Sequence, residues 1–167
     1  MAKWSFSNPT WTPTAVGDTV TQTANGACFL QGGSATQLLT ISEIYLGGEA
    51  IVTSPTFITL ARDSTVAATS ITLGTNGKNA PLSYATAALA APQAPGFSAT
   101  TMPQRAATLH LLNLAFNALG GIVRWVAYPG EEITLYGNAV NVGEVSLSAF
   151  TGGTPGLMSS QIIYEPA

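Results

Sequence analysis

The residues able to do acid–base or nucleophilic chemistry are few in this chain. His110 is the single imidazole and Cys28 the single thiol among 167 residues. A hydrolytic triad would combine His110 with Asp18 or Asp63 and a serine, but no Gly-x-Ser-x-Gly motif surrounds a nucleophile. His110 lies in an apolar run, where a histidine is more often a core or interface residue. The sequence therefore predicts no catalytic site, and it predicts that Cys28 is a small buried side chain without a disulfide partner.

Two adjacent carboxylates, Glu131 and Glu132, directly follow the turn signal Pro129-Gly130. The paired carboxylates of glycosidases face each other from separate elements across about 5–9.5 Å, whereas consecutive side chains in a turn point apart. One histidine and one cysteine do not supply a transition-metal site, and no calcium-binding motif surrounds the glutamates. We therefore expect a solvated turn here, and no metal or other cofactor.

Arg124 is the charged residue that most needs an explanation. It lies between Val123 and Trp125 in an apolar run, where a cation requires a partner. Glu43, in another apolar run, is the candidate partner. The pair could lie in the core or across a subunit interface, and the sequence leaves both open. Arg124 is thus a candidate partner-binding residue.

Short β-strands are the elements that would position these groups. The densest apolar block, residues 108–136, divides into three strands at turns rich in Gly and Pro. The leucine spacing over residues 104–119 also suits a helix. The β-type segments on both sides favour a strand with a bulge instead.

The whole chain is predicted to be all-β, with eight to ten strands in one antiparallel β-sandwich domain over residues 18–167. Jelly-roll order is favoured because short hairpins surround one long crossover. In residues 145–149, apolar residues alternate with serines, which is typical of a strand buried on one face. The other expected strands are residues 36–46, 51–62 and 160–164, and Asn25-Gly26 predicts a hairpin turn ahead of Cys28.

Residues 1–17 are expected to form an extended N-terminal arm, because Pro9 and Pro13 interrupt regular pairing. Aromatic rings in this arm would bury themselves on their own domain or on a neighbouring subunit, and we favour the neighbour. The predicted anchors are Trp4, Phe6 and Trp11.

Residues 63–105 are predicted to form a long Ala/Pro-rich loop. Such a long connection in a compact domain is commonly functional, so we expect it to contact a neighbouring subunit; a surface loop without a partner is the alternative. Tyr84, at the start of a stretch that suits a turn or two of helix, and Arg105, at the end of the loop, are its candidate contact residues.

Charged residues make up 8% of the chain, against about 25% in typical proteins. Five basic and eight acidic residues on a surface of roughly 7,800 Å² predict that much of the surface is buried in a homo-oligomer. A monomer kept soluble by its hydroxyl groups is the alternative. A net charge of −3 argues against binding nucleic acid. No apolar run is long enough to suggest a membrane span or a signal peptide.

The block FNALGGIVRWVAYPGEEITLYG, followed by GEVSLSAF and the closing SSQIIYEPA, resembles small jelly-roll proteins of tailed bacteriophages. These are the decoration or cement proteins on the outside of a capsid. The resemblance covers about the last third of the chain and lies in the overall pattern. It implies a dimeric or trimeric β-sandwich, made in the host cytoplasm and located on the virion exterior, that clamps neighbouring subunits of the major capsid protein.

Two other classes of function remain open from the sequence. A receptor- or glycan-binding jelly roll of a phage tail or fibre would show an exposed aromatic ring beside amide or acidic groups in a concave site. An enzyme would need His110 in a pocket with a nucleophile.

Overall fold

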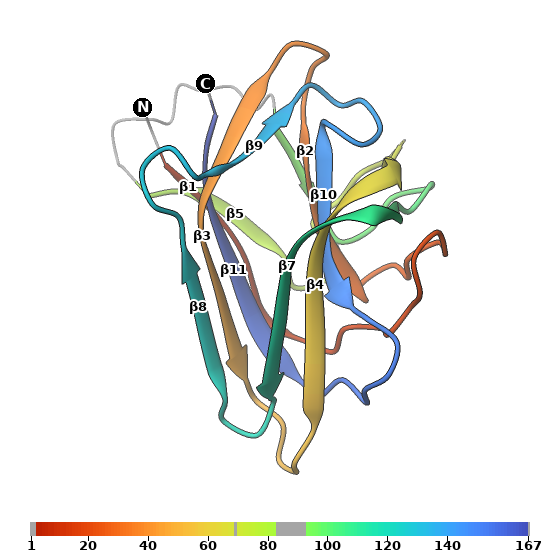
Figure 1. Ribbon diagram of the computed structural model, residues 1–167, viewed down its shortest axis with the longest axis vertical. Coiled ribbons are helices and arrows are strands. Elements are labelled where there is room, and N and C mark those ends of the chain that lie inside the picture. The colour runs from red at the N-terminus through yellow and green to blue at the C-terminus, as the bar shows by residue number, and fades with distance from the viewer. Residues whose placement is uncertain (1–2, 69, 83–92, 167) are drawn as a thin grey trace.

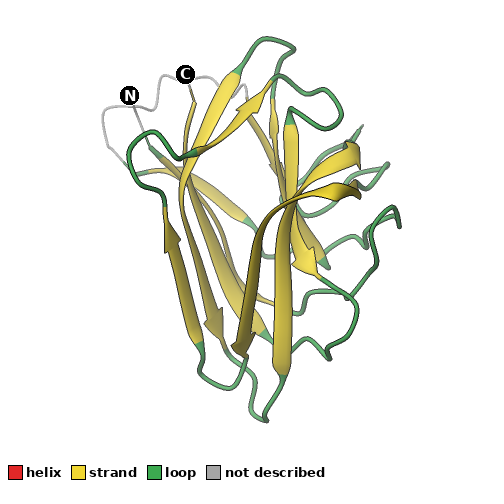
Figure 2. Cartoon of the chain, viewed as in Figure 1, coloured by secondary structure: helices red, strands yellow, loops and turns green. Residues whose placement is uncertain are grey.

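The structure is a computed structural model that describes residues 3–68, 70–82 and 93–166. The described residues form eleven strands and no helix (Figures 1 and 2). The strands make two antiparallel sheets that pack face to face. The predictions of an all-β chain and of an antiparallel sandwich are therefore confirmed. Residues 104–117 form a strand, as favoured over the helix.

The first sheet runs in the order β5–β1–β11–β3, and β8 and β9 pair with different halves of β3 at its outer edge. Its strands are β1 (Trp4–Trp11), β3 (Leu38–Gly48), β5 (Lys78–Pro81), β8 (Ile122–Val126), β9 (Ile133–Tyr136) and β11 (Met158–Pro166).

The second sheet runs in the order β6–β2–β10–β4–β7, so β7 is an edge strand. Its strands are β2 (Ala27–Gly32), β4 (Pro55–Thr65), β6 (Gln93–Gly96), β7 (Gln104–Asn117) and β10 (Glu144–Ala149).

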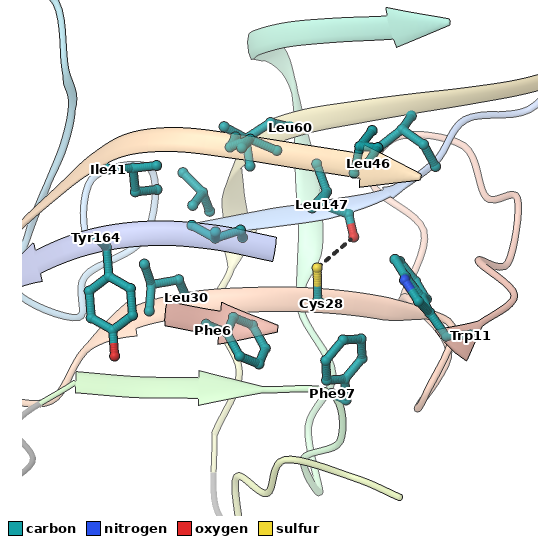
Figure 3. Packing of buried hydrophobic residues seen from close by; sticks show 14 of the residues in the cluster. Phe6, Trp11, Cys28, Leu30, Ile41, Leu46, Leu60, Phe97, Leu147 and Tyr164 are labelled. Carbon is teal, nitrogen blue, oxygen red and sulfur yellow. Dashed lines mark hydrogen bonds between the residues drawn. The ribbon is translucent and has the colours of Figure 1, made fainter. Parts of the chain in front are cut away.

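The core lies between the sheets, where alternate side chains of facing strands meet (Figure 3). A bulge at Ser42 sets which side chains of β3 face inward. Glu43 pairs with Ile163 and Ile41 with Tyr164, so Ser42 is an extra residue. The side-chain alternation shifts by one there, and both Ile41 and Ile44 are buried.

The predicted N-terminal arm is wrong, because residues 4–11 are an internal strand of the first sheet. β1 pairs with β11 on one side and with β5 on the other. Pro9 does not prevent pairing, because it falls where the register between β1 and β11 shifts. Phe6 and Trp11 are buried in the chain's own core, with ring centroids 5.3 Å and 5.4 Å from that of Phe97.

The long loop predicted over residues 63–105 is also corrected for its described part. Residues 63–65 complete β4, β5 pairs with β1, and β6 pairs with β2. Phe97 enters the core between the rings of Phe6 and Trp11. The predicted loop therefore contributes a strand to each sheet and a side chain, Phe97, to the core. Tyr84 and the short helix expected after it lie outside the described residues.

A layer of chain lies over the outer face of the second sheet, and we call it the cover. It consists of residues 12–26, 66–68, 70–72 and 98–103. Isolated bridges join its segments to each other and to the sheet, such as Ala68 with Thr101 within the cover and Thr21 with Gln104 of β7. Phe29 of β2 packs beneath it with Ala67 and Met102. β10 is consequently buried on both faces, and its predicted solvent-facing serines are buried.

The Asn25-Gly26 pair forms a turn, but not the predicted hairpin. Asn25 has a φ of 60°, and the N–H of Gly26 donates to the carbonyl of Thr23 at 2.9 Å. A Cβ on Gly26 would lie 2.2 Å from Thr14 Oγ1. The residues before the turn belong to the cover and do not pair with β2.

Candidate functional site

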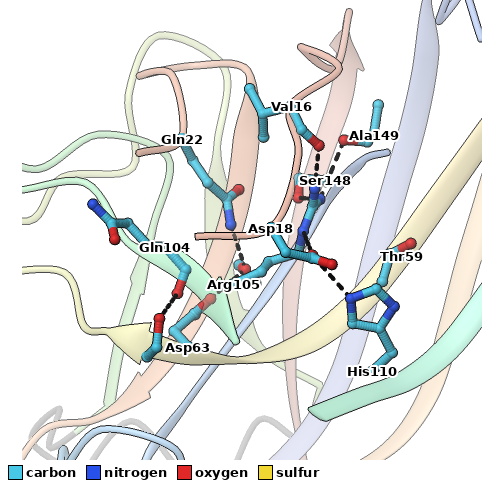
Figure 4. A network of polar contacts seen from close by, with 12 residues as sticks. Val16, Asp18, Gln22, Thr59, Asp63, Gln104, Arg105, His110, Ser148 and Ala149 are labelled. Carbon is cyan, nitrogen blue, oxygen red and sulfur yellow. Dashed lines mark hydrogen bonds and ion pairs between the residues drawn. The ribbon is translucent and has the colours of Figure 1, made fainter. Parts of the chain in front are cut away.

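Arg105 is the centre of a polar network between the cover and the second sheet (Figure 4). The side chain, predicted to bind a partner, is fully buried within the chain itself and presents no surface for that contact. Its Nε lies 3.3 Å from Asp18 Oδ1, Nη1 donates to Ser148 Oγ and to the carbonyl of Ala149, and Nη2 donates to the carbonyl of Val16. Burial lowers the pKa of Arg105, and the adjacent Asp18 opposes this shift. Arg105 thus fastens the cover to β10.

His110 and Asp18 form the pair that a catalytic triad would require. His110 Nε2 lies 2.9 Å from Asp18 Oδ1, and the two side chains are 24% and 18% exposed. Asp18 therefore links His110 to Arg105. Within the described residues, no hydroxyl or thiol makes a hydrogen bond to His110. The ring instead packs edge-on against Phe150, with centroids 5.7 Å apart.

Two carboxyl groups, Asp63 on β4 and Glu144 on β10, are fully buried in the same layer. Ser146 donates to Asp63 Oδ1 at 2.6 Å, and Gln22 Nε2 donates to Ser146 Oγ at 2.6 Å. The N–H of Ala67, in the cover, donates to both oxygens of Glu144, at 2.9 Å and 3.1 Å. Asp63 Oδ2 is buried without a partner among the described residues.

Burial raises the pKa of Asp63 to about 7. Burial, and then the charge of Asp63, raise the pKa of Glu144 to about 10. Such a pair holds a proton at neutral pH. Because neither group is exposed, a substrate could reach the pair only after the cover had moved. In the described part of the chain, no three His, Cys, Asp or Glu side chains are placed to hold a metal ion.

The predicted pairing of Arg124 with Glu43 is confirmed, and it lies on the exposed outer face of the first sheet. Arg124 Nη2 is 2.9 Å from Glu43 Oε2, and the Tyr45 hydroxyl donates to the same oxygen at 2.5 Å. These two hydrogen bonds lower the pKa of Glu43. The guanidinium also lies over the Tyr45 ring, 5.0 Å from its centroid. Next to this group is a shallow hollow of about 410 Å³ whose lining is mixed, with Ser7, Tyr45 and Gln161 beside Leu46 and Ile122.

A second hollow, of about 400 Å³ and mostly apolar, lies between the start of β4, the end of β7 and the loop that follows β10. Its lining includes Pro55, Phe57, Ala115, Asn117 and Gly152. Phe57 is 36% exposed, and its ring lies edge-on to that of Phe150 with centroids 6.2 Å apart. The hollow therefore has an aromatic wall beside an amide.

One end of the sandwich carries a group of exposed aliphatic side chains, which we call the apolar end. Residues 49–54 connect β3 to β4 and residues 118–121 connect β7 to β8, side by side in Figure 1. Backbone hydrogen bonds join the two loops, from Gly48 N–H to Gly121 O at 2.7 Å and from Ala50 N–H to Ala118 O at 2.9 Å. The exposed side chains are Ile51 at 93%, Ile122 at 81%, Val52 at 64% and Leu119 at 49%.

Sequence reasoning missed the apolar end because Ile51 was assigned to a strand that begins only at Pro55. The available signal was an aliphatic pair, Ile51-Val52, between two glycines and a proline. Of the predicted partner-binding residues, Arg124 is exposed, Trp4 is partly buried against the core, and Phe6, Trp11 and Arg105 are buried. The structure does not bring them together at one surface. Glu131 and Glu132 follow a turn, as predicted, and the N–H of Gly130 donates to Glu132 Oε2 at 2.7 Å.

Comparisons with protein-family models, with curated proteins and with solved structures found no match. None of the described residues belongs to a helix that is long and apolar enough to cross a membrane.

Proposed function

We propose that this chain is a virion structural protein that binds the outside of an assembled capsid and bridges neighbouring major capsid subunits without catalysis. Strand order supports a jelly roll, an architecture of viral capsid and lectin domains. The strand order is β1–β11–β3–β8 in one sheet and β2–β10–β4–β7 in the other, so strands from the first and second halves of the chain alternate in each sheet. β5 and β6 then extend this arrangement at the side of β1 and β2.

The apolar end is the observation that carries the proposal. Three of its four aliphatic side chains project from the hydrogen-bonded loops and the fourth, Ile122, from the first residue of β8; Glu49 is the single charged residue in these loops. Fully burying one such side chain contributes about 1.5–3 kcal/mol, so burial of these four would favour a contact. A protein that binds only the assembled shell stabilises the shell by mass action. We therefore place the capsid-binding surface at the apolar end, and not at the aromatic residues of β1 that the sequence suggested.

The test is the binding of variants to capsid particles that lack the protein. Ile51→Asp should weaken binding more than tenfold, because it places a charge in an apolar contact and a factor of ten corresponds to about 1.4 kcal/mol. Val140→Asp is the matched control, since Val140 is 49% exposed in the loop after β9, away from the apolar end. Sedimentation with particles measures both. Equal binding of the two variants would show that the apolar end does not contact the shell.

The second candidate function, glycan or receptor binding, is supported by the hollow beside Phe57. An exposed ring with an amide in a concave site is the arrangement that a sugar-binding module needs, because sugars stack on rings and hydrogen-bond to amides. A glycan array probed with wild type and with Phe57→Ala tests this function. Tyr128→Ala, which removes an exposed ring elsewhere, is the control. Binding lost only with Phe57→Ala would favour this function over the first.

A further inference from the structure

The edge of β7 is open along most of its length. β7 pairs with β4 on one side. On the other side, Thr19 and Thr21 of the cover engage only its first two residues: the N–H of Thr19 donates to Arg105 O, and Thr21 bridges Gln104. Over residues 106–116, no described strand pairs with this side, and Figure 1 shows β7 at the border of its sheet.

The backbone groups of Asn113 and Ala115 point out of this edge. The carbonyl of Phe57 accepts from the N–H of Phe150, so Phe57 directs its backbone groups toward β10. Phe57 faces Ala115 across β4 and β7, which makes this a non-hydrogen-bonded pair. Ala115 and, two residues away, Asn113 therefore direct their N–H and C=O groups away from β4. Residues 112–117 pair with β4 without a register shift, so the outward backbone groups along this part of the edge are regularly spaced for another strand to pair with.

Natural edge strands are protected from pairing by Lys, Pro, charged residues or short length. Residues 106–117 contain no Lys, Arg, Asp, Glu or Pro. The side chains that β7 turns inward, Leu112, Leu114 and Phe116, pack against the core but remain partly exposed. Both the backbone and the apolar side chains at this edge therefore lack a complete covering within the described residues.

We propose that a second copy of this chain pairs antiparallel with β7 and continues the second sheet across a two-fold axis at Leu114. In this register Asn113 of one copy lies opposite Ala115 of the other, which forms four backbone hydrogen bonds, two at each pair. Leu114 faces its symmetry mate, and Leu112 faces Phe116, so that apolar side chains meet on the inner side. An identical, uncharged edge gives no electrostatic repulsion, and the same surface serves both partners. The proposal assigns a surface to the homo-oligomer that the low charge density of the sequence predicts.

The test compares Ala115→Pro with Ala115→Val in the full chain by light scattering coupled to size exclusion. Proline removes the outward N–H but no hydrogen bond to β4, a position where edge strands tolerate it; valine keeps the N–H. Wild type and Ala115→Val should show twice the chain mass of 17.1 kDa, and folded Ala115→Pro should show half of that dimer mass. If Ala115→Pro does not fold, amide hydrogen exchange of the wild-type protein is measured instead. The amides of Asn113 and Ala115 should exchange more slowly as the protein concentration rises.

A wild-type dimer that Ala115→Pro leaves intact, or amides whose exchange is independent of concentration, would overturn pairing through β7 and leave self-association standing. A wild-type protein that is monomeric at tens of micromolar would overturn both the β7 pairing and the predicted self-association. A β7 dimer that does not bind particles would contradict the capsid function alone.

Discussion

The buried carboxyl pair predicts that the protein becomes less stable as pH rises, and that Glu144→Gln removes the part of this dependence that comes from one of the two protons. Glu144 is fully buried beside Asp63, and both carboxyl pKa values are raised. In each case the folded state binds a proton more tightly than the unfolded chain. The resulting stabilisation is complete at pH values below the ordinary carboxyl pKa and is lost as pH rises through the folded pKa.

The size of the effect follows from the pH window. For Asp63 the loss runs from about pH 4 to its folded pKa of about 7, and for Glu144 from about pH 4.5 to about 10. Each bound proton changes the free energy of unfolding by about 1.4 kcal/mol per pH unit. Between about pH 5 and pH 8, Glu144 alone should therefore lower it by up to about 4 kcal/mol, a large part of the 5–15 kcal/mol typical of a domain.

Urea unfolding of wild type at a series of pH values measures this slope. Glu144→Gln keeps a carbonyl oxygen that accepts from the N–H of Ala67 and removes the titrating proton, so its slope should be smaller by one proton. Glu131→Gln, at an exposed site after the turn, is the control and should keep the wild-type slope. Wild-type stability that is constant or rises between about pH 5 and pH 8 would refute the reasoning, as would a full slope in Glu144→Gln.

Three further predictions concern the core and the close packing of the sheets. Trp11→Ala should lower the free energy of unfolding by about 3–5 kcal/mol in urea titrations, because the ring is buried against Phe97; a change below about 1 kcal/mol would contradict its place in the core. Gly48→Ala should destabilise the same protein, since the new Cβ would lie 2.2 Å from the carbonyl oxygen of Ala118, and a melting temperature equal to wild type would argue against that contact. Burial raises the pKa of the Cys28 thiol to about 12, so a thiol reagent should label Cys28 only in denaturant; rapid labelling of the native protein would place the thiol at the surface.

Local patterns predicted most of the strands. β7 has helical leucine spacing, yet it forms a strand whose register with β4 shifts near Leu60, as a bulged strand requires. The turn before Glu131 also lies where Pro129-Gly130 indicated it. These features depend on residues within a few positions of each other, so local propensity and turn chemistry were sufficient to predict them.

Features that depend on distant segments were not predictable from local patterns. Ser146 and Ser148 alternate with apolar residues as though they faced water, but the cover buries them. Asp18 meets Arg105 and His110 across 87 and 92 positions of sequence. Trp11 was assigned to an arm because two prolines flank it, whereas the bulge around Pro9 lets the strand continue. In each case packing in three dimensions, which no local window contains, decided the outcome.

The most direct measurement of the central proposal is the copy number of the protein in gradient-purified virus particles, by quantitative mass spectrometry, with surface biotinylation of intact particles. The proposed function predicts a fixed ratio to the major capsid protein and labelling of Lys78, which is exposed at the edge strand β5. Absence of the protein from the particles would contradict the proposal. A few copies per particle would also contradict it and would favour the glycan- or receptor-binding function at a tail.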